Sequence, residues 1–79
     1  MTKLPVVSSK KVIKALRSAG FEDAPKRGKG SHSAMIKRSA DGVHLVIIPN
    51  RTSIPIGTLK AIIDQAGLSR DEFMNLLES

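Results

Sequence analysis

The two histidines of this sequence, His32 and His44, are the side chains of a type suited to proton transfer near neutral pH. His32 follows Gly30 and Ser31, at the end of a short basic segment rich in glycine. Exposed backbone N–H groups in such a segment can hold a phosphate. RNA needs little more for cleavage, because its 2′-OH is an internal nucleophile. A base removes the 2′-OH proton, an acid protonates the leaving 5′ oxygen, and a cation stabilises the charge of the phosphorane.

Each histidine also has a plainer interpretation. On local sequence alone, His32 fits an ordinary strand residue better than a catalytic one, and His44 lies in the middle of a predicted strand without basic neighbours. Other chemistries have weaker support. Two histidines without cysteine, and without His-x-x-x-His spacing, argue against a metal site, so neither a metal nor a cofactor is expected. The run from Gly28 to Ser31 lacks the spacing of a nucleotide-binding P-loop.

Positive charge is concentrated in the first half of the chain. The sequence has 13 lysines and arginines against seven aspartates and glutamates, and ten of the basic residues lie within residues 1–38, with only two of the acidic ones. Such asymmetry is typical of a protein that binds a polyanion, above all a nucleic acid. A surface that only keeps the protein in solution is the alternative.

The aromatic residues limit how RNA would be bound. Phe21 and Phe73 are the only ones, and both are expected in the core, so no platform for base stacking is predicted. Contacts to RNA should therefore be mainly to its backbone. The candidate RNA-binding residues are the polar and basic ones near His32 and on the strand that follows it, namely Lys26, Arg27, Lys29, Ser31 and Lys37.

The order of the elements is predicted from apolar spacing and from turn residues. A helix should follow Ser8 or Ser9 and end at Gly20, with Phe21 packing back onto it. Residues 21–27 are consistent with a short edge strand, and residues 31–38 and 43–48 with an antiparallel hairpin.

Two helices should follow a loop at residues 49–57. The first ends at Gly67 with Leu68 packing back, and the second begins at Ser69, which has capping-box spacing to Glu72. Helices gathered on one face of a small antiparallel sheet of two or three strands make an α+β domain, which we expect to span residues 1–79.

The strand at 43–48 is apolar on both of its faces. Val43, Leu45 and Ile47 would line one face, and Val46 and Ile48 the other. A sheet with helices on one side has little left to cover the second side, so a partner protein is expected there. We expect Val46 and Ile48 to lie on the side left for the partner. Self-association and covering by the 49–57 loop are the alternatives.

Two segments together resemble the HicA family of toxin messenger-RNA interferases. They are Gly30-Ser31-His32 before a strand, and Ile48-Pro49 followed by the Gly57-Thr58-Leu59 to Ala66-Gly67 helix. Many relatives carry histidine directly after the Gly-Ser-His segment or after Ile-Pro, where this sequence has Ser33 and Asn50. The resemblance implies an α-β-β-β-α fold like the double-stranded RNA-binding domain. It also implies metal-independent cleavage of RNA with His32 as the catalytic group, and neutralisation by an antitoxin of the HicB type.

The alternative function is a non-catalytic RNA-binding module on the same fold. A third interpretation, a small inhibitor or adaptor protein, would leave the positive charge of the chain unexplained. The absence of cysteine is compatible with a reducing compartment, and no signal peptide or apolar run of membrane-spanning length is visible. We therefore expect a cytoplasmic protein that makes no use of a membrane.

Overall fold

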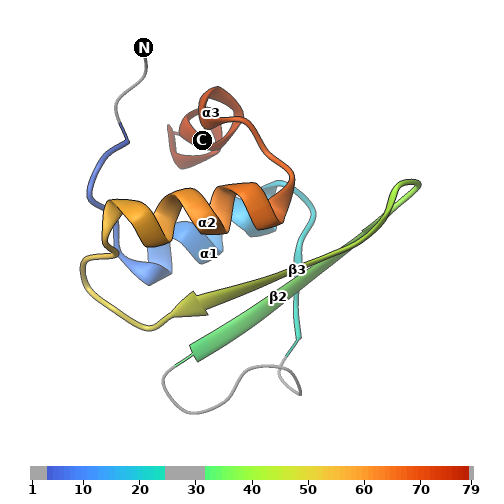
Figure 1. Cartoon of the computed structure of the whole chain (residues 1–79), viewed down its shortest axis with the longest axis horizontal. Helices are drawn as coiled ribbons and strands as arrows, with labels where there is room; N and C mark the ends of the chain where they lie inside the picture. The colour runs from blue at the N-terminus through green and yellow to red at the C-terminus, as the bar shows by residue number, and fades with distance from the viewer. Residues whose placement is uncertain (1–3, 25–31, 79) are drawn as a thin grey trace.

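The computed structural model describes residues 4–24 and 32–78, with helices and strands in the order α-β-β-β-α-α. The elements are helix α1 (Ser9–Ser18), strands β1 (Glu22–Asp23), β2 (His32–Ser39) and β3 (Gly42–Pro49), and helices α2 (Ile56–Ala66) and α3 (Arg70–Glu78) (Figure 1). This confirms the predicted α+β class, the α-β-β-β-α order, and the additional last helix. The helices lie together on one side of the sheet (Figure 1).

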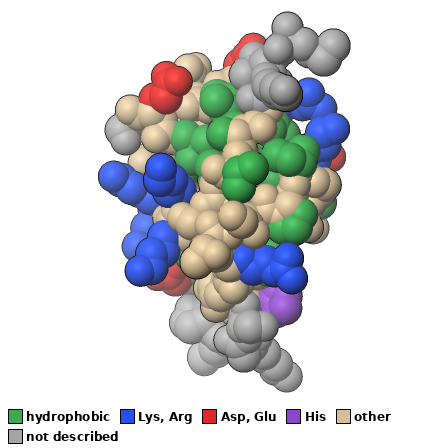
Figure 2. Space-filling view, turned by 90° about the vertical axis from the view of Figure 1, so that its left-hand side faces the viewer, with side chains coloured by type: hydrophobic (Ala, Val, Ile, Leu, Met, Phe, Trp, Pro, Cys, Tyr) green, Lys and Arg blue, Asp and Glu red, His purple; other side chains and the backbone are tan. Residues whose placement is uncertain are grey.

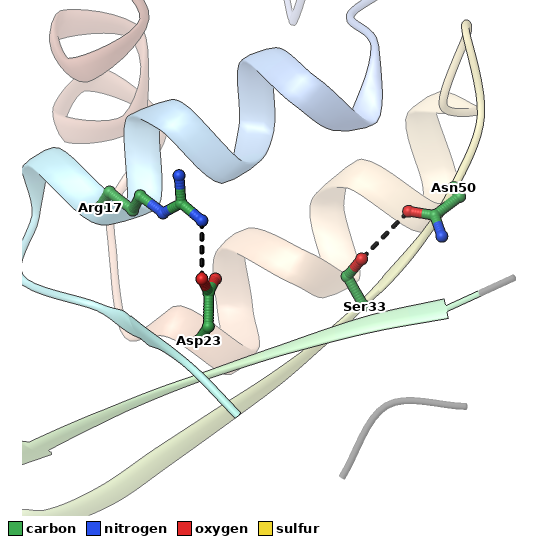
Figure 3. A network of polar contacts seen from close by, with 4 residues as sticks. All are labelled: Arg17, Asp23, Ser33 and Asn50. Carbon is green, nitrogen blue, oxygen red and sulfur yellow. Dashed lines mark hydrogen bonds and ion pairs between the residues drawn. The ribbon is translucent and has the colours of Figure 1, made fainter. Parts of the chain in front are cut away.

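The sheet is an antiparallel meander in the order β1-β2-β3. Strands β2 and β3 pair over their whole length, so that His32 lies opposite Pro49 at one end and Ser39 opposite Gly42 at the turn. Within the predicted edge strand at 21–27, Glu22 and Asp23 form β1, and residues 25–27 lie outside the described residues. The Arg17 guanidinium of α1 forms an ion pair with the Asp23 carboxylate of β1, with 2.7 Å between nitrogen and oxygen (Figure 3). Because both side chains are exposed, this contact stabilises the fold by less than about 1 kcal/mol.

The core lies between the sheet and the helices. Met35 of β2 is paired with Val46 of β3, and both are fully buried together with Ile48. They pack against the apolar sides of the helices, which contribute the buried residues Val12, Leu16, Leu59, Ile62, Ile63 and Phe73. The prediction that Val46 and Ile48 face a partner is therefore wrong, because α2 lies against β3 on their side. The outward side carries Val43, which is 59% exposed, and Ile47, which is 37% exposed.

Both helix ends predicted at glycine are confirmed. Gly20 and Gly67 have positive φ angles of 99° and 72°. The next residues, Phe21 and Leu68, each donate a backbone hydrogen bond to a carbonyl five residues earlier, at 3.0 and 3.2 Å. This is the Schellman pattern, in which the left-handed residue lets the chain reverse and satisfies a free carbonyl of the last turn.

Helix α3 begins with the predicted capping box. The backbone N–H of Ser69 donates to the Glu72 carboxylate at 2.9 Å, and the backbone N–H of Glu72 donates to the Ser69 hydroxyl oxygen at 3.1 Å. Hydrogen bonds from the Ser69 backbone N–H and from the Ser69 hydroxyl to the Glu72 carboxylate hold the pKa of Glu72 below its ordinary value. These caps place the next residue, Phe73, in the core, where it is fully buried, as the sequence predicted.

Candidate active site

A pocket of about 460 Å³ lies where β2 begins and β3 ends. Its walls come from the two strand ends, from the loop after β3 and from the first turn of α2. One part of the lining is polar or charged and the other is apolar. Among the residues that the structure describes, those that line the pocket are His32, Asn50, Arg51 and Thr58 on the polar part, and Ile47, Pro49 and Pro55 on the apolar part.

His32 is the first residue of β2 and its side chain is exposed. Because it pairs with Pro49 and side chains alternate along a strand, His32 lies on the outward side of the sheet, the side of Val43 and Ile47. The residue singled out from the sequence therefore lines the pocket and has an exposed side chain.

Arg51 supplies a cation to the same pocket. Its backbone is fixed by the start of α1, since its carbonyl accepts from the Ser9 N–H at 2.9 Å and its N–H donates to the Ser9 hydroxyl oxygen at 3.3 Å. Ile54 also donates a backbone hydrogen bond to Val7, at 2.8 Å. The chain before α1 thus holds the loop after β3 in place, and with it the backbone of the arginine that lines the His32 pocket.

Sequence reasoning missed Arg51 and Thr58 as site residues. The pairing register of the predicted hairpin could have indicated Arg51. When His32 opens one strand and Pro49 closes its antiparallel partner, the residues directly after Pro49 must lie near His32. Thr58 belongs to the Gly57-Thr58-Leu59 motif, which places it in the first turn of α2 and at the pocket.

Ser33 and Asn50 contact each other across the hairpin. The Ser33 hydroxyl donates a hydrogen bond to the side-chain oxygen of Asn50 at 3.1 Å (Figure 3). Ser33 is the neighbour of His32 on β2, and Asn50 directly follows β3 and lines the pocket. This contact links the two strand ends that form the pocket.

Of the predicted RNA-binding residues, Lys37 is the one that the structure describes, and Lys26, Arg27, Lys29 and Ser31 lie outside the described residues. Lys37 lies five residues beyond His32 on β2, on the opposite side of the sheet and roughly 16 Å along the strand. Its ammonium group donates to the Ala19 carbonyl at 2.7 Å and lies 5.9 Å from the centre of the Phe21 ring. The structure therefore places Lys37 at the end of α1 and away from His32, and its contact with RNA stays a prediction.

His44 lies apart from the pocket. It is half-buried on the helix side of β3, where a Cβ atom added at Gly67 would come within 2.9 Å of its ring.

Within residues 4–24 and 32–78, no three histidine, aspartate or glutamate side chains lie close enough to hold a metal ion. None of the helices that the structure describes is long and apolar enough to cross a membrane.

Comparison with sequence models of protein families shows which family the chain belongs to. The sequence model described as HicA toxin of bacterial toxin-antitoxin matches residues 9–68, well over half of the chain. The chain belongs to the HicA toxin family. It is thus a toxin of the toxin–antitoxin type, as the resemblance indicated. A comparison with curated proteins found no match.

The HicA match covers the described lining of the pocket. The described lining residues run from His32 to Thr58, within the matched range. Ser9, which holds the backbone of Arg51, also lies within that range. Helix α3 lies beyond the matched range and packs against α1, on the side of the molecule away from the sheet (Figure 1). The described residues of the candidate site therefore lie within the part of the chain that matches the HicA family.

Proposed function

We propose that this HicA toxin is a metal-independent endoribonuclease of messenger RNA, with His32 as its proton-transfer group. The observation that carries the proposal is the presence of His32 and Arg51 in one open pocket. A titratable imidazole and a permanent cation are the two groups that cleavage at an RNA 2′-OH requires most. At the lower edge of the face drawn in Figure 2 a histidine lies directly below positively charged side-chain surface, and positive charge at that place attracts a polyanion.

The reaction is a transesterification within the RNA, in which the phosphorus exchanges its bond to the 5′ oxygen for a bond to the adjacent 2′ oxygen. His32 takes the proton of the 2′-OH, and the 2′ oxygen bonds to the adjacent phosphorus. The bond from phosphorus to the 5′ oxygen breaks, and that oxygen takes up a proton. The Arg51 guanidinium stabilises the extra negative charge of the phosphorane. The products carry a 2′,3′-cyclic phosphate on one fragment and a 5′-OH on the other.

Chelation provides the first test of this function. RNA cleavage by the purified protein should proceed at the same rate in EDTA as in magnesium, because the described pocket supplies His32 and Arg51 but no cluster of metal ligands. Gel electrophoresis measures the rate, and mass spectrometry should find cyclic phosphate ends. Activity that EDTA abolishes and magnesium restores, or products with 5′-phosphate ends, would refute the proposal.

We further propose that an antitoxin of the HicB type covers the outward side of the sheet and closes the pocket. Val43 and Ile47 expose apolar surface on that side, next to the half-buried Leu45 and Ile36. Such a patch on a small domain is typical of a protein interface. Ile47 belongs both to this patch and to the lining of the His32 pocket. A partner that packs on the patch would therefore exclude RNA from His32.

A further inference from the structure

We propose that Asn50 is a second catalytic residue, whose side-chain amide donates a hydrogen bond to a non-bridging oxygen of the scissile phosphate, and that Ser33 positions it. This inference rests on the proposed ribonuclease function and adds a role to the same pocket. It comes from one contact, the 3.1 Å hydrogen bond from the Ser33 hydroxyl to the Asn50 oxygen (Figure 3).

In the structure the Asn50 amide turns its oxygen toward Ser33. An asparagine amide carries an acceptor oxygen on one side and an NH₂ with two donors on the other. Ser33 occupies the oxygen, and in Figure 3 the amide nitrogen of Asn50 points away from the serine. The residue also lines the pocket with His32 and Arg51. Its two N–H donors are therefore left for a group other than Ser33.

A phosphate oxygen is the acceptor that the pocket favours. The neighbouring Arg51 attracts an anion, and the amide N–H donors suit an oxygen that gains negative charge as the phosphorane forms. A donor that is already oriented stabilises this charge more in the transition state than in the bound substrate. Asn50 should therefore raise the maximal rate of cleavage and leave the affinity for RNA almost unchanged.

Ser33 is a positioning residue in this scheme. Its backbone belongs to β2 and is fixed by pairing with β3, whereas Asn50 follows the strand and has an exposed side chain. Without the hydroxyl, the Asn50 side chain is free to rotate. Because an exposed hydrogen bond between neutral side chains adds little net stability, its loss should change cleavage and not folding.

The test measures cleavage of RNA in single turnovers, over a range of protein concentrations. Asn50→Ala should lower the maximal rate by about 10²-fold, the usual effect of removing one such donor, with little change in half-saturation. Asn50→Asp keeps an acceptor for Ser33 but has no N–H donor, and should be at least as slow. An unchanged maximal rate in both variants, or a change in half-saturation alone, would overturn the catalytic role.

The role of Ser33 is tested through Asn50. Ser33→Ala should slow cleavage roughly tenfold through misalignment. Ser33→Thr, which keeps the hydroxyl on a strand residue, should restore the rate. In an Asn50→Ala background, Ser33→Ala should have no further effect. The positioning role would be overturned if Ser33→Ala slowed cleavage as much in the Asn50→Ala background as in the unaltered protein. It would also be overturned if Ser33→Ala lowered the thermal stability enough to account for the slower cleavage.

The two levels of proposal fail in different ways. If the unaltered protein and His32→Ala cleave RNA equally, or neither cleaves, the ribonuclease function itself fails. If cleavage requires His32 but Asn50→Ala retains the full rate, the function stands and the inference about Asn50 is wrong.

Discussion

Replacing His32 with alanine is expected to slow RNA cleavage by about 10²–10⁴-fold, the usual contribution of one proton-transfer group. The side chain is exposed at the start of β2 and lines the pocket, so its removal leaves the core intact. Circular dichroism and thermal unfolding should match those of the unaltered protein. The rate of cleavage in single turnovers measures the effect without interference from product release.

His44→Ala is the matched control, since it removes the only other histidine. His44 lies on the helix side of the sheet beside Gly67, so its loss should leave the rate of cleavage near that of the unaltered protein and cost some stability. A well-folded His32→Ala protein that cuts RNA at an undiminished rate would remove His32 from the mechanism. It would leave the alternative of an RNA-binding module without catalysis.

Val46→Asp is expected to unfold the protein. Val46 is fully buried between the sheet and the helices, and a carboxylate there has neither water nor a cation to stabilise it. The cost of burying it, together with the lost apolar contacts, should exceed about 3 kcal/mol, a large part of the 5–15 kcal/mol that stabilises a typical domain. Loss of cooperative thermal unfolding at neutral pH is the measurement.

Val43→Asp makes the same chemical change on the opposite side of the same strand. Val43 is 59% exposed and does not line the pocket, so fold and cleavage should be retained. Inhibition by a HicB-type antitoxin should weaken, because a charge then lies within the apolar patch. Full inhibition of Val43→Asp would contradict the interface assigned to this side. Loss of a dimer alone would assign the side to self-association.

The local features of the fold were predictable because their signals lie within a few residues. Glycine followed by an apolar residue marked the ends of α1 and α2, and the spacing of Ser69 and Glu72 marked the start of α3. The start of α2 was not predictable, because its N-cap is Pro55, which makes no side-chain capping bond. Where such a bond is present, as in α1, where the Ser8 hydroxyl oxygen accepts from the Lys11 backbone N–H, the predicted boundary was correct.

The side of the sheet that faces the helices was not predictable from β3 alone. The alternation of side chains along β3 puts Val46 and Ile48 on one face and Val43 and Ile47 on the other. Because both faces are apolar, the sequence pattern does not predict which of them α2 covers. The position of Arg51 depends on hydrogen bonds to Ser9, which is 42 residues away in sequence. Contacts of that range need the assembled fold.

His32 was identified from its motif, but the rest of the candidate site needed the pairing of the strands. Ser33 and Asn50 stood out in the sequence only as departures from the histidines of many relatives. Their hydrogen bond joins the ends of β2 and β3 and links Asn50, which lines the His32 pocket, to the strand that begins with His32. Basic charge alone was a weaker guide, since Lys37 donates to the Ala19 carbonyl at the end of α1.

The most direct test of the central claim compares two RNA oligonucleotides that differ by one oxygen atom. The first is a short RNA that the protein cleaves at one bond, and the second lacks only the 2′-OH beside that bond. In EDTA, the first should yield a 2′,3′-cyclic phosphate and a 5′-OH, and the second should remain intact because the internal nucleophile is missing. Cleavage of both at similar rates would contradict the chemistry assigned to the His32 pocket.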